Sequence, residues 1–483
     1  MKKFLVVLLS LGLLVAFGAT ASAADVKFGG GYYLVGVYND NANLNSGGSY
    51  SRAFFYQRVR IEPVFTIAEG LTFTARMDAL EKQWGQTNWK STTLVTGAQG
   101  DNTNSRTNPG GAQKIQENFE WERGYVTFKT AIGQFDVGYM SAAAWGTQFA
   151  DSEDTKPRIK FTTQAGPLTL IALYEKRFEA DASVVPGYAG KADADSDNYY
   201  LIGVYGFKGG NAGLLYGYIF NNTQRLAVAN PPIYGPYQMK LHLLAPYLKA
   251  TFGPVYVEAE ASYWFGKARE YDNVTGAKDM KRDGLSAYAL AKVNMGPAYF
   301  GGQVGWSAGD DYADIEKAKN GGGCGTDWNP ALLLLNDEFA TWGGGSIATG
   351  KLPAAILTAA GIPGGRVGGV PDSAKQNTLM WNIFGGFNPT PKLNLETSFT
   401  VATVDKKEVE FYNAVGTKVG SGTAESNKLG MEWDLKASYK IYDNLTYMVG
   451  AGYLWTGDYF KGATGSAEVG NSYILMNKLS LSF

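Results

Sequence analysis

Charged residues stand at every second position in several short stretches of this sequence, with apolar residues between them. In one stretch Arg58, Arg60 and Glu62 alternate with Val59 and Ile61. Side chains at alternate positions of a β-strand point to the same face, so these charges share one face and the apolar residues share the other. Opposed charges fixed along a wet wall orient water and sort ions by sign. The residues that this pattern places on such a face are Arg58, Arg60, Glu62, Arg76, Asp78, Arg123, Asp136, Arg158 and Lys160.

Alternating segments of this kind recur along the whole chain, and we count eighteen of them. Short connections such as 68–70 alternate with long ones, as at 84–118, 222–239 and 405–427. Short turns on one side and long loops on the other are typical of transmembrane β-barrels. The sequence therefore predicts an all-β, antiparallel transmembrane barrel of about eighteen strands, with sixteen as the other count, short periplasmic turns and long extracellular loops. A large soluble β-sandwich is the alternative fold. The expected strands lie near 26–38, 52–67, 71–83, 119–129, 134–140, 157–164, 167–178, 198–208, 212–221, 240–252, 255–266, 284–294, 298–308, 376–388, 392–404, 428–442, 445–457 and 471–483.

The predicted hairpin at 428–455 indicates most clearly which face meets which solvent. Glu432 and Asp434 alternate with an apolar series that contains Leu429, Met431 and Trp433. A basic side chain on the lipid face near the midplane would cost about 2–4 kcal/mol, so charged positions are expected to face inward. In a barrel of about eighteen strands, the interior is a water-filled lumen that wall side chains alone do not fill.

The N-terminus has the pattern of an export signal. Lys2 and Lys3 precede the apolar run 4–17, and the small residues Ala21, Ser22 and Ala23 follow. This pattern predicts a signal peptide at residues 1–23; a membrane anchor is the alternative, for which the run is short. No later stretch has the roughly 18 uncharged apolar residues that a transmembrane helix needs. Residues 24–483 are therefore expected to form one exported barrel domain.

Composition and motifs argue against several other classes of protein. The formal net charge of −1 gives no basic footprint for nucleic acid. Cys324 is the only cysteine, which excludes an intramolecular disulfide framework. His242 is the only histidine, and no serine or aspartate motif surrounds it, so we expect no enzymatic activity. Neither metal-ligand spacing nor a phosphate loop occurs, and we expect no metal and no cofactor.

The last segment, 471–483, has one apolar face with aromatic residues at both ends. Tyr473, Leu479, Leu481 and Phe483 share this face. The segment resembles the C-terminal signal of Gram-negative outer-membrane β-barrels, in which the final strand pairs with the first. This resemblance implies that the four residues form an assembly signal for the barrel-assembly machinery, and that the protein resides in outer-membrane lipid.

A second resemblance covers about a quarter of the chain. Residues 122–126, followed by 133–139, are similar to the strand pair that precedes the constriction loop of general porins. The resemblance implies that loop 141–156 folds into the pore and that its carboxylates face the arginines of the wall. These loop carboxylates are Asp151, Glu153 and Asp154. General porins usually have sixteen strands and form trimers, so a homotrimer is one arrangement that the resemblance leaves open. The alternative is that the charges only solvate a wet wall.

The predicted extracellular loop 309–375 is rich in glycine and contains two apolar islands, 328–335 and 352–362. Loops this long are usually functional or disordered. The islands either plug the mouth, cover a neighbouring subunit, or belong to a loop that packs on itself at the surface.

The chain resembles the porins of delta-class proteobacteria, and this resemblance implies an outer-membrane channel with passive diffusion of small hydrophilic solutes and ions as its function. A substrate-specific channel is one alternative. The other is a barrel scaffold that holds a redox or secretion partner complex.

Overall fold

The computed structural model describes most of the chain after the predicted signal peptide. The predicted signal peptide at 1–23 and the second apolar island at 352–362 lie outside the described residues. The described residues are 25–41, 44, 46, 51–85, 119–152, 154–179, 194–226, 236–272, 278–310, 316–319, 321, 324–342, 366–368, 377–412, 418–461 and 468–483.

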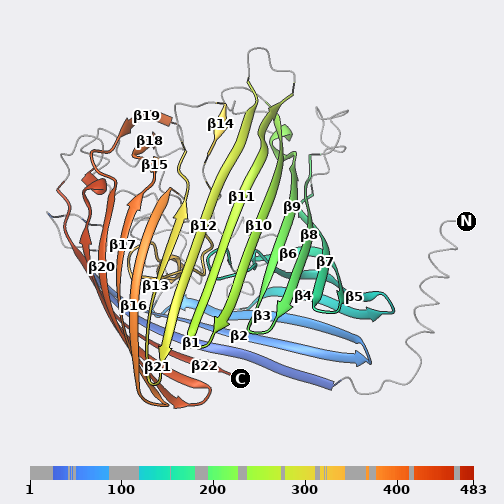
Figure 1. The fold of residues 1–483 in the computed structure, drawn as a ribbon, viewed down its shortest axis with the longest axis horizontal. Coiled ribbons are helices and arrows are strands. Elements are labelled where there is room, and N and C mark those ends of the chain that lie inside the picture. Colours follow the sequence, from blue (N-terminus) through green and yellow to red (C-terminus); the bar gives the residue numbers. More distant parts are fainter. Residues whose placement is uncertain are drawn as a thin grey trace, which may run out of the picture.

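The chain forms a closed antiparallel β-barrel of eighteen strands, as the sequence predicts, and Figure 1 shows the barrel from its side. Neighbours in sequence are neighbours in the barrel, and β1 pairs with β22 to close it. The barrel strands are β1 (Asp25–Asp40), β2 (Arg52–Ala68), β3 (Leu71–Gln83), β4 (Phe119–Thr130), β5 (Gly133–Ala142), β6 (Asp154–Ala165), β7 (Leu168–Phe178), β8 (Ser196–Phe207), β9 (Gly210–Asn221), β10 (Tyr237–Phe252), β11 (Val255–Tyr271), β12 (Met280–Met295), β13 (Ala298–Ser307), β16 (Thr378–Thr390), β17 (Leu393–Val404), β20 (Lys428–Tyr442), β21 (Leu445–Thr456) and β22 (Ser472–Ser482).

The remaining elements are short and belong to the long connections. β14 (Lys317–Ala318) pairs in parallel with Lys281 and Arg282 at the start of β12. A separate small sheet, which lies above the barrel rim in Figure 1, joins β15 (Arg366–Gly368), β18 (Glu408–Tyr412) and β19 (Lys418–Thr423). The helical turns are η2 (Thr223–Leu226), α3 (Asp337–Thr341) and η3 (Asp458–Lys461). Within the described part of the chain, no helix is both long and apolar enough to cross a membrane.

The closing pair of strands is in continuous register. Gly31 lies opposite Ser482 at one end of the seam, and Asp40 lies opposite Tyr473 at the other. Phe483 extends the pairing, because its backbone N–H and C=O both hydrogen-bond to Gly30. A Cβ atom at position 30 would stand 2.3 Å from the backbone oxygen of Arg60, so only glycine fits between the two neighbouring strands. No edge is left open at the seam, which a barrel in lipid requires.

The outer face of the barrel is apolar and the inner face is polar, but one residue of the predicted hairpin departs from the expected alternation. Met431 and Trp433 face outward, with 44% and 48% of their surface exposed, while Glu432 and Asp434 are buried inside. Leu429 was expected to face outward and is instead 1% exposed, within the interior. The cause is a β-bulge: Ala402 pairs with Gly430 and Thr403 with Lys428, so Leu429 is the extra residue.

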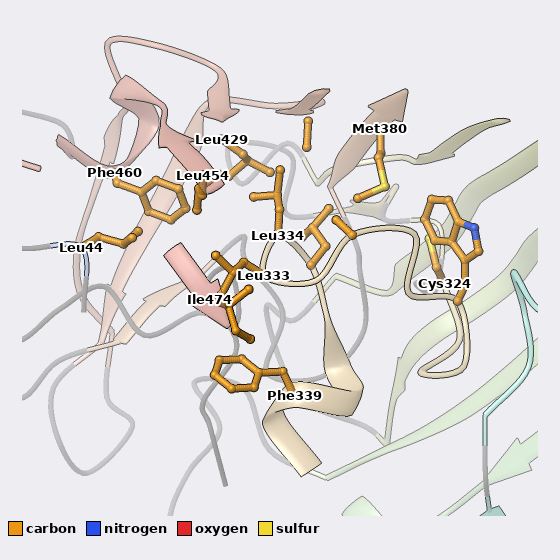
Figure 2. Packing of buried hydrophobic residues seen from close by; sticks show 14 of the residues in the cluster. Leu44, Cys324, Leu333, Leu334, Phe339, Met380, Leu429, Leu454, Phe460 and Ile474 are labelled. Atoms are coloured by element: carbon orange, nitrogen blue, oxygen red, sulfur yellow. The ribbon is translucent and has the colours of Figure 1, made fainter. Parts of the chain in front are cut away.

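Part of the lumen is filled by an apolar core. Leu333 and Leu334, from the long connection after β13, pack inside the barrel with Met380, Leu429 and other inward side chains of the strand walls (Figure 2). The first apolar island of the sequence, 328–335, thus lies within the barrel rather than on its surface. Among the described residues, open space remains in the interior beside β4 to β11 and, in a smaller cavity, beside β11 to β20.

The register of the closing strands can be tested by a disulfide across the seam. Leu34 lies directly opposite Leu479, and opposite residues of antiparallel neighbours have the Cα spacing that a disulfide needs. In a Cys324→Ser background, Leu34→Cys with Leu479→Cys should cross-link efficiently under oxidation. Cross-linking joins the two ends of the barrel, so the heat-denatured protein should migrate faster on a non-reducing gel.

The matched control pairs Leu34→Cys with Leu435→Cys, an outward residue on β20, two strands further from β1. This control should give no intramolecular cross-link. Cross-linking of the control pair, or none at the seam, would contradict the observed closure.

Candidate functional site

One group of wall charges is built around Asp78 of β3. Arg60 of β2 donates two hydrogen bonds to it, from Nε at 2.7 Å and from Nη2 at 2.6 Å. Arg76 and Arg58 lie at 3.4 and 3.7 Å from the same carboxylate. Glu62 lies 3.6 Å from Arg76. The structure therefore brings together five of the predicted residues, with three guanidinium groups around one buried carboxylate.

A second group lies on β4 to β7. Arg158 of β6 donates from Nε to Glu175 of β7 at 2.7 Å and from Nη1 to the backbone oxygen of Ser141 at 2.7 Å. Lys160 lies 2.9 Å from Asp136 of β5. Arg123 of β4 faces the same part of the lumen. Glu175 also belongs to this group, although sequence periodicity did not single it out.

The connection between β5 and β6, which we call the crossing loop, folds into the barrel and crosses to the opposite wall. Thr147 donates to Glu260 of β11 from both its backbone N–H and its hydroxyl, each at 2.7 Å. The indole of Trp145 donates to the backbone oxygen of Ala245 on β10 at 3.0 Å. Phe149 stacks on Tyr288 of β12, with ring centroids 5.1 Å apart. Because β5 and β12 are seven strands apart in the barrel, this connection spans the lumen.

The predicted acidic residues of this connection have other neighbours than the arginines of β2 and β3. Asp151 accepts a hydrogen bond from the backbone N–H of Trp145. Burial raises the pKa of Asp151 to about 6, although that hydrogen bond opposes the shift. Asp154 begins β6 and lies 2.8 Å from Lys156. Among the described residues, no ion pair joins Asp151 or Asp154 to the Asp78 group. Glu153 lies outside the described residues.

A second segment, 324–342, enters the lumen from the other side. Buried Glu432 of β20 accepts the backbone N–H groups of Leu333 at 2.7 Å and Leu334 at 2.6 Å. Asp434 accepts the N–H of Leu332 at 3.3 Å. Backbone donors inside a protein are costly to leave unpaired, so two wall carboxylates hold this segment against the barrel.

The two inward segments meet inside the barrel. The N–H of Gly325 donates to the backbone oxygen of Phe149 at 2.7 Å, and the N–H of Asp327 donates to the backbone oxygen of Asp151 at 3.1 Å. The N–H of Thr326 donates to the hydroxyl of Ser152 at 3.0 Å. Together they form a partition that narrows the lumen from both sides.

A cavity of about 540 Å³ remains between this partition and the wall of β4 to β11. Among the described residues, no group of three or more histidine, cysteine, aspartate or glutamate side chains is arranged to hold a metal ion. The residues that line the cavity include Arg123, Trp145, Arg158, Leu243, Trp264 and Gly325.

Several solved outer-membrane barrels are similar to this chain in fold. OccK2 (OpdF) of Pseudomonas aeruginosa, solved with glucuronate, has 11% identity and a TM-score of 0.48, with 96% of this chain and 100% of that chain covered. A BenF-like porin from Pseudomonas fluorescens has 12% identity and a TM-score of 0.46, with 95% and 99% covered. OmpT of Vibrio cholerae has 11% identity and a TM-score of 0.37, with 96% and 99% covered. Identities this low carry no information about solutes. The chain matches no known family's sequence profile and no curated protein sequence.

The hold of Glu432 on segment 324–342 can be tested by substitution. Glu432→Ala leaves the N–H groups of Leu333 and Leu334 without acceptors, at about 1–3 kcal/mol for each buried donor. The segment should then leave the wall more often, and single-channel recordings in a planar bilayer should show larger and more variable conductance. Glu432→Gln keeps one acceptor oxygen and should give an intermediate result.

The control is Glu270→Ala, which removes a carboxylate that pairs with Lys240 and Lys267 near the end of β11 and touches neither inward segment. Its conductance should match the parent. Parental conductance in Glu432→Ala would mean that segment 324–342 does not limit the pore.

Proposed function

We propose that this protein is an outer-membrane channel through which small hydrophilic solutes and ions diffuse passively. The observation that carries the proposal is the inverted solvation of the barrel: its outer wall is apolar and its inner wall bears the paired charges of β2 to β7. Such a wall needs lipid outside and water inside. The inward segments 143–152 and 324–342 would set the size limit, and the wall charges would set the ion preference.

The proposal includes a route to the membrane. Residues 1–23 would be removed during export, and the C-terminal strand with Tyr473, Leu479, Leu481 and Phe483 would engage the barrel-assembly machinery. The organisation would be that of the porins of delta-class proteobacteria, either as single barrels or as homotrimers.

A barrel scaffold around a folded partner fits the interior less well. The apolar core on Leu333, Leu334 and Met380 occupies the lumen next to the later strands. A folded partner would have to displace this core and break the hydrogen bonds at Glu432. A channel for small solutes needs only the space that the core leaves free.

The arginines around Asp78 provide a test of ion preference. Replacing Arg58, Arg60 and Arg76 with serine removes three positive charges and leaves Asp78 unneutralised by them. Reversal potentials in a salt gradient should therefore move towards cation preference. The shift should shrink as salt rises, because the Debye length falls to about 3 Å at 1 M.

A complementary experiment replaces three acidic residues with their amides: Asp151 and Glu153 of the crossing loop, and Asp154 at the start of β6. Reversal potentials should move towards anion preference, and less so near pH 6, where Asp151 is already partly protonated. Lys278→Ser, at an exposed position in an outer connection, serves as the control and should leave the reversal potential unchanged. Parental values in both triple variants at low salt would place the narrowest point of the pore elsewhere.

Orientation gives an independent test of the membrane assignment. The short turns, such as 69–70 between β2 and β3, lie at the barrel end where the chain enters β1 and leaves β22. If that end faces the periplasm, protease added to intact cells should cut only in the long connections, as at 309–375. Cleavage at the short turns in intact cells would mean the opposite orientation.

A further inference from the structure

The cavity beside the crossing loop has two unlike walls. One wall consists of β4 to β7 and carries the basic residues Arg123, Arg158, Lys160 and Arg177. The other wall is apolar and includes Leu243 and Trp264. A volume of about 540 Å³ lies within the roughly 300–1,000 Å³ typical of small-molecule sites.

The carboxylates on the basic wall already have partners. Asp136 forms an ion pair with the ammonium group of Lys160 at 2.9 Å and accepts a hydrogen bond from the hydroxyl of Thr127 at 2.7 Å. Glu175 is 1% exposed. One of its oxygens accepts a hydrogen bond from Arg158, and the other accepts one from the Asn198 amide at 2.9 Å. The four basic residues of the cavity therefore face three carboxylates, Asp136, Asp154 and Glu175, and the wall has an excess of hydrogen-bond donors.

Arg123 accounts for this excess. Its Nε is buried without a hydrogen-bond partner, and no ion pair involves it among the described residues. A guanidinium group stays charged at any working pH and presents its donors in a planar fork that fits a carboxylate. A buried donor without a partner is unfavourable, so this position favours an anionic acceptor from the solute.

A glycine lies on the basic wall between two residues that line the cavity. Tyr125 lies opposite Gly138, which in turn lies opposite Arg158, so a residue without a side chain separates two large inward ones. Gly138 has a φ of +134°, and a Cβ atom there would stand 2.5 Å from the backbone oxygen of Gly124. Any other residue would be strained at this position, so the close approach of β4 and β5 beside Tyr125 requires glycine.

The opposite wall supplies apolar contact. Leu243 of β10 lies opposite Trp264 of β11, and Leu215 of β9 is buried beside them. Trp145 of the crossing loop completes this side and is held edge to face against Tyr247, at 4.9 Å between ring centroids. Such a surface gains free energy when it covers a ring or a hydrocarbon chain and gains none from a small hydrated ion.

We propose that this cavity binds a small organic anion, with its acid group on Arg123 and its apolar ring or chain between Leu243, Trp264 and Trp145. The inference deepens the proposed function, because it names the class of solute that the channel would retain on its way through the lumen. It implies saturable transport of such anions alongside the diffusion of simple ions.

Binding can be measured by equilibrium dialysis of the folded, detergent-solubilised barrel with 3-phenylpropionate. Two comparison probes separate the parts of the site: 3-phenylpropionamide has the same body without charge, and acetate has the charge without the body. The expected order is clear saturable binding of 3-phenylpropionate and at least about tenfold weaker binding of the other two. Arg123→Gln should weaken 3-phenylpropionate binding by about tenfold or more, the loss expected for a charge-assisted hydrogen bond.

Lys292→Gln is the matched control. It removes one positive charge from the lumen outside this cavity, where Lys292 lies over the rings of Tyr256 and Tyr299. Its affinity for 3-phenylpropionate should stay within about twofold of the parent. Arg123→Lys keeps the charge without the planar fork and should bind with intermediate affinity. Heat-modifiable gel mobility checks that each variant is folded.

Equal affinity in Arg123→Gln would overturn the proposal, and so would equal binding of the amide or of acetate. The same protein in a planar bilayer separates this result from the proposed function. Open-channel conductance without saturable binding would overturn the anion site and leave the channel standing. Saturable, Arg123-dependent binding without conductance would support the site and overturn passive diffusion.

Discussion

The division of this barrel into an outer and an inner face depends on the pairing of its first and last strands. In lipid each unpaired backbone N–H or C=O group costs several kcal/mol, so a sheet in that solvent has to close. Closure brings the last strand against the first. The backbone N–H and C=O of Phe483 both hydrogen-bond to Gly30. Once the sheet is closed, one face of each strand meets lipid and the other meets the lumen. The alternating sequence of each strand follows from that division.

Inside the barrel, backbone N–H groups also hold the two inward segments against the wall. Both inward segments are non-regular chain apart from the short helix α3. Each is held by a wall glutamate that accepts backbone or hydroxyl donors: Glu260 for segment 143–152 and Glu432 for segment 324–342. A single carboxylate can accept several donors at once, which makes it an efficient anchor for a turn of chain. The apolar core thus fills one part of the lumen, and the crossing loop bounds another.

Sequence alone was sufficient for the strands and insufficient for the route of the loops. All eighteen predicted strands occur, because lipid and water impose a period of two over the length of each strand. Leu429 was assigned to the wrong face, since a bulge shifts the period by one and only the neighbouring Gly430 hints at it. The loop anchors join residues 113 and 99 positions apart, and no local pattern specifies such contacts. The partners of Asp151 likewise depend on how its own loop turns back.

The apolar core inside the lumen has a consequence for how the protein responds to temperature. Side chains such as Leu333, Phe339 and Ile474 are removed from water rather than from lipid. Their contribution to stability therefore has the heat-capacity signature of a soluble protein's core and weakens on cooling. The outer face of the strand walls is instead transferred into lipid, so its contribution depends on insertion of the closed barrel and not on packing within the lumen. This membrane protein thus combines a barrel held by hydrogen bonds with an interior that depends on water for its cohesion.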